Sequence, residues 1–235
     1  MVFYPDSNPE VDSVDGSVSH SNAGGLAWLN FVQGAGTGSD DLVSEAAVAW
    51  GRVAVGFNFT QLTRGVEIFN LFALPFATTH ILGAVLSLQN CNAPGSDPQG
   101  VNSDINVYET FPASDVALVP GDFPLFGAIP WCDTPVRWNV WNAAVWVDFI
   151  LNDTAIKELN NTRMARLGLR NAEFDVAQQL DPAGAHVPPL NDPFANRWFI
   201  FRWWTAEILD TRRPYLTVTY AIPPTVSTVP ATEIT

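Results

Sequence analysis

The sequence contains little charge, and positive charge is the scarcest part of it. Among 235 residues, 11 Lys and Arg stand against 24 Asp and Glu, so the formal net charge is −13, and charged residues make up only 15% of the chain. Binding to nucleic acid or to an anionic membrane surface depends on clustered Lys and Arg. We therefore expect neither nucleic acid nor a membrane as a partner.

Residues that build reactive centres are also rare. The two cysteines, Cys91 and Cys132, have no metal-ligand spacing, and the sequence leaves open whether they are free thiols or form one disulfide. The three histidines, His20, His80 and His186, are far apart, and each is expected to be a surface or loop residue. No histidine belongs to a known metal-binding pattern.

Long apolar runs are missing as well, although 47% of the residues are hydrophobic. No run approaches the roughly 18 residues that a membrane-spanning helix needs. Residues 1–16 are polar and acidic, which is not typical of a signal peptide, so synthesis in the cytoplasm is expected.

The sequence is rich in residues that favour short strands and turns. It contains 9 Trp, 15 Phe, 18 Pro and 16 Gly. Strands are predicted over residues 2–6, 27–32, 46–59, 64–72, 81–89, 104–109, 143–151, 165–170, 197–204 and 215–220. The segment 64–72 alternates as a half-buried strand does, and 112–135 is typical of an ordered loop.

One short helix is predicted after Asn152 or Asp153, either of which can accept hydrogen bonds from the first free N–H groups of a helix over Ala155–Leu159. Many short strands without alternating helices predict an all-β protein. We expect one antiparallel two-sheet jelly-roll sandwich over residues 1–220, followed by an extended Pro/Thr-rich C-terminal arm over 221–235.

The order of several segments resembles the DNRLRE-type jelly-roll modules. The segments are Arg64–Phe69 with its Arg-Gly-x-x-x-Phe pattern, then Leu74-Pro75, Ile81–Leu88, Ile105–Tyr108, Asp148–Ile156 and the closing Arg213–Tyr220. The opening Phe3–Asp6, Val14–Gly16 and Gly34–Gly38 resemble structural proteins of tailed, often marine, phages. The resemblance implies a virion protein or a cell-surface adhesion or polysaccharide-binding module, and it brings no catalytic motif.

No arrangement of residues predicts an enzyme. Neither a nucleophile elbow nor a phosphate-binding loop is present, since Gly34–Gly38 lacks the Lys-Ser/Thr of such a loop. Paired carboxylates could hydrolyse glycosides, and the candidates are Asp104, Glu109, Asp148 and Glu207. With 24 acidic residues some pairing is expected in any fold, so we predict no catalytic residue.

No cofactor is predicted, and Ca²⁺ is the one metal that the loops could suit. Asp12 with Asp15, and Asp40 with Asp41, are the acidic pairs that such an ion would use. No EF-hand pattern is present, and solvated turns are the favoured interpretation of both pairs.

Tryptophans at the end of the chain provide the candidate contact residues. On a strand over 197–204, Trp198 shares a face with Arg202 and Trp204, whereas Trp203 points to the opposite face. One face must therefore be core. The other face is predicted to contact a subunit or a glycan, and because the sequence does not say which face is core, Trp198, Trp203 and Trp204 are all candidates.

These features predict a non-enzymatic structural protein of a phage virion. We expect a capsid decoration or fibre-type component, made in the host cytoplasm, that forms a symmetric homo-oligomer and contacts other virion proteins. The alternative from the sequence is a carbohydrate-binding or adhesion module that acts at a cell surface, with an extracellular or cell-surface location.

Overall fold

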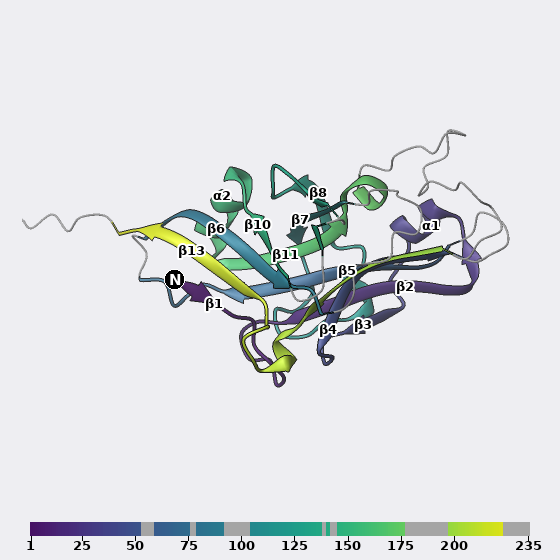
Figure 1. The fold of residues 1–235 in the computed structure, drawn as a ribbon, viewed down its shortest axis with the longest axis horizontal. Coiled ribbons are helices and arrows are strands. Elements are labelled where there is room, and N and C mark those ends of the chain that lie inside the picture. Colours follow the sequence, from purple (N-terminus) through teal and green to yellow (C-terminus); the bar gives the residue numbers. More distant parts are fainter. Residues whose placement is uncertain are drawn as a thin grey trace, which may run out of the picture.

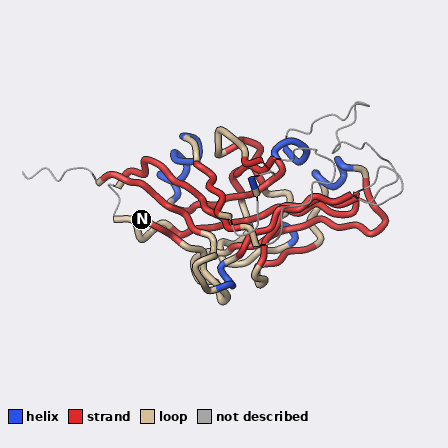
Figure 2. The backbone as a smooth tube through the Cα atoms, in the orientation of Figure 1, coloured by secondary structure: helices blue, strands red, loops and turns tan. Residues whose placement is uncertain are grey.

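The computed structural model describes residues 1–52, 59–75, 79–91, 104–137, 140–141, 145–176 and 197–222. They form two antiparallel β-sheets around one hydrophobic core (Figures 1 and 2). Sheet A has the order β1 (Val2–Phe3), β13 (Tyr215–Ala221), β6 (His80–Gln89), β10 (Trp146–Ile150). Sheet B follows the path β12 (Arg197–Trp204), β4 (Glu45–Arg52), β5 (Phe59–Asn70), β11 (Met164–Asn171), β7 (Asp104–Thr110), β8 (Phe126–Pro130).

Three further strands widen sheet B. The strand β2 (Asp15–Leu26) pairs with β5 and with β3 (Gly38–Asp40), and β9 (Val136–Arg137) pairs with β7. Thus β3 begins at the last residue of the glycine-rich segment Gly34–Gly38, and β8 and β9 arise within or beside the predicted loop 112–135.

The strand order is that of a jelly roll. In chain order, the first to eighth core strands are β1, β5, β6, β7, β8, β10, β11 and β13. Sheet A then holds the first, eighth, third and sixth strands, and sheet B the second, seventh, fourth and fifth. Two interlocked Greek keys produce this arrangement. The predicted all-β, two-sheet jelly-roll sandwich is therefore confirmed, and the predicted C-terminal arm lies almost entirely outside the described residues.

The predicted helix is present as α2 (Asp153–Thr162), and the Asn152 side chain caps it by accepting a hydrogen bond from the Ala155 N–H at 3.2 Å. The predicted strand over 27–32 is wrong, because α1 (Trp28–Gln33) occupies this segment. Trp28, Phe31 and Val32 are buried at helical spacing, so one side of α1 packs on the protein.

The strand β5 is buried on both faces, and its prediction as half-buried is wrong. Val66 and Glu67 point to opposite faces, and neither is exposed. One face packs toward sheet A. The other is covered by α1, by the 3₁₀ turn η1 (Pro120–Asp122) and by the π-helix η3 (Ala172–Val176), because Arg64 on this face of β5 bonds to Val32 of α1, to Phe123 next to η1 and to Asp175 of η3.

Sheet B divides along β5. Residues 61–63 of β5 pair with both β2 and β4, and residues 65–67 pair with both β2 and β11. Because a strand has only two edges, β4 and β11 share one edge of β5. The ribbon of β4 and β12 therefore leaves the sheet, and Trp203 of β12 forms an isolated bridge with Asn90, next to the end of β6.

Candidate functional site

The outer face of sheet A carries a row of three aromatic rings, which we call the aromatic row. Leu216 and Val218 point into the core, so Tyr215 points outward. The Tyr215 ring centroid lies 4.9 Å from that of Trp146 on β10 and 6.2 Å from that of Tyr4, which follows β1. Tyr4 is 45% exposed, whereas the other two rings are half-buried. Three residues from distant parts of the sequence thus build one aromatic surface.

Polar groups surround the row. The Arg213 guanidinium carbon lies 4.0 Å from the Tyr4 ring centroid, a cation–π contact. A hollow of about 460 Å³ opens beside Tyr4 and Tyr215 and is also lined by Leu209, Asp210, Thr211 and Arg213. On the other side of the row, Trp146 lines a second hollow of about 690 Å³ between β9 and β10.

An aliphatic row crosses the same face next to the aromatic one. The register places Val2 beside Thr217, Thr217 beside Val85, and Val85 beside Ile150, so these side chains cross all four strands of sheet A. Ile150 is 71% exposed and Leu82, farther along β6, is 58% exposed. Contiguous exposed apolar surface of this kind is typical of a contact with another molecule.

The tryptophans predicted as contact residues divide between core and surface. Trp203 is fully buried, and its Nε1–H donates to Glu67 Oε1 at 2.5 Å, so this residue belongs to the core and contacts no ligand at the surface. Trp204 is half-buried, with the Arg212 guanidinium 4.5 Å from its ring centroid. The Trp198 side chain lies outside the described residues. The alternation predicted for this strand is confirmed for Trp203 and Trp204.

The face of β12 that carries Arg202 borders a trough of about 470 Å³ where sheet B divides. Its floor is the register row Ser19, Thr63, Ala49 and Ile200. At the side of the trough, Arg202 forms an ion pair with Glu45 at 3.6 Å. No lining residue is aromatic, so the trough offers hydroxyl groups but no ring on which a sugar could stack.

A pair of carboxyl groups is buried beyond the trough. Asp15 and Glu67 face each other in the β2–β5 ladder, and neither is exposed. Asp15 accepts a hydrogen bond from the Ala206 N–H at 2.8 Å, and Glu67 accepts from Trp203. Burial raises the pKa of both carboxyls well above the ordinary values, and repulsion by Glu207 adds to the rise at Asp15, as repulsion by Asp15 and Glu207 does at Glu67. Closed to solvent, the pair has no access for a substrate.

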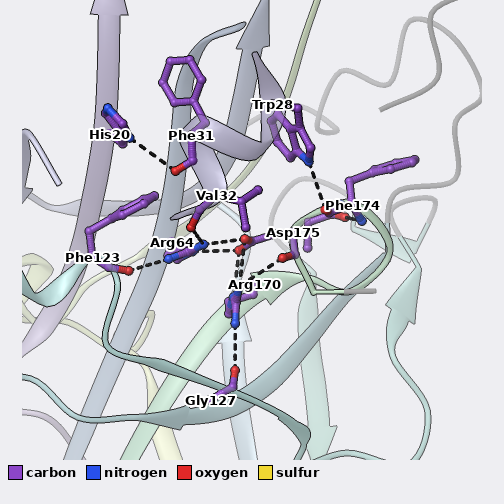
Figure 3. A network of polar contacts seen from close by, with 11 residues as sticks. His20, Trp28, Phe31, Val32, Arg64, Phe123, Gly127, Arg170, Phe174 and Asp175 are labelled. Atoms are coloured by element: carbon purple, nitrogen blue, oxygen red, sulfur yellow. Dashed lines mark hydrogen bonds and ion pairs between the residues drawn. The ribbon is translucent and has the colours of Figure 1, made fainter. Parts of the chain in front are cut away.

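A second buried polar cluster fastens the cover of sheet B (Figure 3). The Asp175 carboxylate, in η3, accepts two hydrogen bonds from Arg64 of β5 and two from Arg170 of β11, at 2.6 to 2.9 Å. Arg64 also donates to the carbonyls of Val32 and Phe123, and its guanidinium lies over the Phe123 ring. The cluster therefore joins α1, η1, η3 and two strands, which is a structural role.

The other candidate residues are not brought together as a site. Asp104 and Glu109 lie on β7, Asp148 on β10 of the other sheet, and Glu207 in the short turn Ala206–Ile208. Of these four, only Asp148 lines one of the three hollows.

In the acidic pairs considered for Ca²⁺, most carboxylates are buried or accept hydrogen bonds from backbone N–H groups. Asp15 is buried, Asp40 accepts from the Leu42 N–H, and Asp41 accepts from the Leu118 N–H, while Asp12 is exposed. Within the described ranges, no group of three or more His, Cys, Asp or Glu could hold a metal ion.

The remaining scarce residues behave in part as expected. Both cysteines are free thiols, which settles the alternative that the sequence left open. His80 is exposed, but His20 is buried in β2 beside Phe31, so its prediction as a surface or loop residue is wrong. His186 lies outside the described residues.

The aromatic row was missed from the sequence. The alternation in 215–220 separates Tyr215 from the core residues Leu216 and Val218, and this pattern could have indicated that Tyr215 points outward. The contact with Tyr4 and Trp146 depends on the pairing of β13 with β1 and, through β6, with β10. That pairing is a property of the jelly roll and not of any local pattern.

No known protein family matches the chain, and no similar curated protein was found. Among the described residues, no helix is long and apolar enough to cross a membrane.

Proposed function

We propose that the chain is a non-enzymatic carbohydrate-binding protein that contacts its ligand through the outer face of sheet A. The observation that carries the proposal is the aromatic row of Tyr4, Tyr215 and Trp146, flanked by two hollows. Aromatic rings provide flat apolar surface at a small entropic cost, and they pack against the C–H faces of sugar rings.

The groups around the row suit a neutral sugar. Asp210 and Arg213 line the smaller hollow, and Asp148 lies on the same face as Trp146. Carboxylates and a guanidinium can hydrogen-bond to hydroxyl groups from both the acceptor and the donor side. A net charge of −13 disfavours acidic polysaccharides by repulsion. The row is therefore preferred over the trough, which has hydroxyl groups without an aromatic ring.

A glycan array followed by calorimetry tests this proposal. Tyr215→Ala removes the central ring of the row, and we expect the Kd for a bound neutral glycan to rise at least about tenfold, equivalent to about 1.4 kcal/mol. Phe72→Ala is the matched control, because Phe72 is an exposed aromatic residue that is not part of the row. No binding to any glycan, or equal losses in both variants, would contradict the proposal.

The aliphatic row favours a second role as a structural subunit. Here the chain is a homo-oligomeric component of a phage virion, of the decoration or fibre type, and the apolar side of sheet A contacts another subunit. The two roles are compatible, because the aromatic and aliphatic rows occupy neighbouring positions on the face.

Light scattering coupled to size-exclusion chromatography tests the second role. We expect an oligomer that Leu82→Glu weakens, while Ile129→Glu, at an exposed position on β8 of sheet B, leaves it intact. A chain that stays monomeric at all concentrations and binds no capsid or tail protein would refute the structural role.

A further inference from the structure

The open edge of sheet A presents unpaired backbone groups. Among the strands that the structure describes, β10 is the last of this sheet and pairs with β6 alone. The Asn90 N–H donates to the Val145 carbonyl, and the Leu151 N–H donates to the Ala84 carbonyl. Hydrogen-bonded pairs recur at every second residue of an antiparallel ladder. Residues 147 and 149 therefore bond to β6, and the N–H and C=O groups of Trp146, Asp148 and Ile150 point away from the sheet.

This edge is available to an added strand. Among the described residues, no hydrogen bond is made to the backbone groups of Trp146, Asp148 or Ile150. The 690 Å³ hollow runs beside them and is lined mainly by apolar side chains, including Val136, Val140 and Leu151. An extended segment could bond to the edge and place every second side chain toward the hollow, which is the geometry of β-strand addition.

The chain contains a segment of matching length and composition. Residues 225–229 read Thr-Val-Ser-Thr-Val, a five-residue run that Pro224 and Pro230 bound on either side. Thr and Val favour strands, and proline cannot donate to a ladder, so the run is delimited at both ends. The open strand β10 is also five residues long.

The run cannot reach the edge of its own copy. Ala221 pairs with His80, whereas Ile150 pairs with Val85, which lies five residues farther along β6. A strand added beyond β10 would lie three strand spacings, or about 14 Å, to the side of β13. Its nearest end, beside Ile150, would also lie about 17 Å from Ala221 along the strand direction, so the total distance from Ala221 is about 22 Å. The four Cα steps from Ala221 to Thr225 span at most about 14 Å.

We propose that residues 225–229 of one copy add to the free edge of β10 in a neighbouring copy, so that copies of this chain assemble by exchange of their C-terminal segments. The inference rests on the assembly role proposed above and supplies its contact. A two-fold arrangement lets each copy give one segment and receive one, which closes the assembly as a dimer.

Two proline variants of the full chain test the exchange. Ile150→Pro removes an N–H that points to the open edge and leaves the ladder with β6 intact, and Ser227→Pro removes a donor from the run. Each variant alone should lower the association constant of the dimer at least about tenfold, whereas Thr232→Pro, outside the run, should leave it unchanged. Circular dichroism and the melting temperature check that each variant is folded.

Mixing the two variants separates the exchange from simple damage. An intact run on Ile150→Pro copies still meets an intact edge on Ser227→Pro copies, so the mixture should form heterodimers that neither variant forms alone. If the wild type is an oligomer and both variants still form that oligomer, the exchange is wrong while assembly stands. The same conclusion follows if the mixture of variants stays monomeric. If the wild type is a monomer, both assembly and exchange are wrong.

Discussion

Replacing Asp175 with Asn should destabilise the protein far more than the loss of one ordinary ion pair. Asp175 is completely buried, and its carboxylate is the shared partner of Arg64 and Arg170. Both oxygens of the carboxylate accept hydrogen bonds from the two guanidinium groups, but an amide has only one accepting oxygen. Its NH₂ group would face the N–H donors of the arginines. Two buried cations would then lose their counter-charge.

The magnitude follows from burial. Breaking a buried ion pair by removing one partner costs about 3–5 kcal/mol, because the remaining charge is left uncompensated. A domain is stable by only about 5–15 kcal/mol in total, so Asp175→Asn should remove a large part of the free energy of unfolding. The cover made of α1, η1 and η3 should loosen first, because Arg64 ties these segments to β5.

Urea denaturation of Asp175→Asn and of a matched variant, Asp115→Asn, measures the difference. Arg166 and Asp115 form the same two-pronged pair at 2.6 and 2.8 Å, but about a third of each side chain is exposed (33% and 32%). Exposed pairs contribute about 0–1 kcal/mol, so Asp115→Asn should cost under about 1 kcal/mol. Equal losses in the two variants would refute the argument from burial.

The pH dependence gives a second check on the same residue. Burial alone would raise the pKa of Asp175, but the charges of Arg64 and Arg170 outweigh it and hold the pKa well below the ordinary value of 3.8. The stabilisation is therefore complete above about pH 4 and is lost as the pH falls toward the folded-state pKa. The gap in unfolding free energy between wild type and Asp175→Asn should narrow in acid, and a constant gap would contradict this assignment.

Three other predictions concern the interior. Burial raises the pKa of Glu67, so the folded protein becomes less stable as the pH rises above 4.5, where the carboxyl ionises in the unfolded chain. In urea denaturation, Glu67→Gln should therefore be more stable than wild type at pH 8 and should lose this advantage at pH 4. Gly65→Ala would place a methyl carbon 2.3 Å from Cη2 of the Trp203 ring and should cost about 1–3 kcal/mol or more. Gly83→Ala meets no atom within 4 Å and should be neutral or stabilising in thermal melts. Burial raises the pKa of the Cys132 thiol to about 12, so iodoacetamide should label it quickly only after unfolding; fast labelling of the native protein would contradict this.

Local patterns were sufficient for most strands. Segments 81–89, 104–109 and 215–220 show alternation or β-branched runs, and the structure has β6, β7 and β13 there. The Asn152 cap also signalled α2 correctly. These elements carry their information in neighbouring residues, so they can be predicted without knowledge of the fold.

The segment 27–32 shows where local patterns fail. Its Trp, Phe and Val favour a strand, and Ala27 supplies no side-chain cap that would signal a helix. Six residues are too few for a helix to be stable alone, so packing on sheet B decides its conformation. Arg64 is similar, because a charged residue on an alternating strand is expected outside, and its burial depends on a counter-charge from Asp175, 111 residues away.

The placement of the buried cluster of Arg64, Arg170 and Asp175 bears on where a partner can bind. One face of sheet B packs toward sheet A, and the other is covered by segments that Arg64, Arg170 and Asp175 hold in place. Within the part of the chain that the structure describes, the outer face of sheet A has no such cover. Antiparallel sheets commonly leave one face in water, but that face is then mainly polar. Here it carries an aromatic row, an aliphatic row and an open edge, so recognition is expected on sheet A, and substitutions there should change binding without affecting the core.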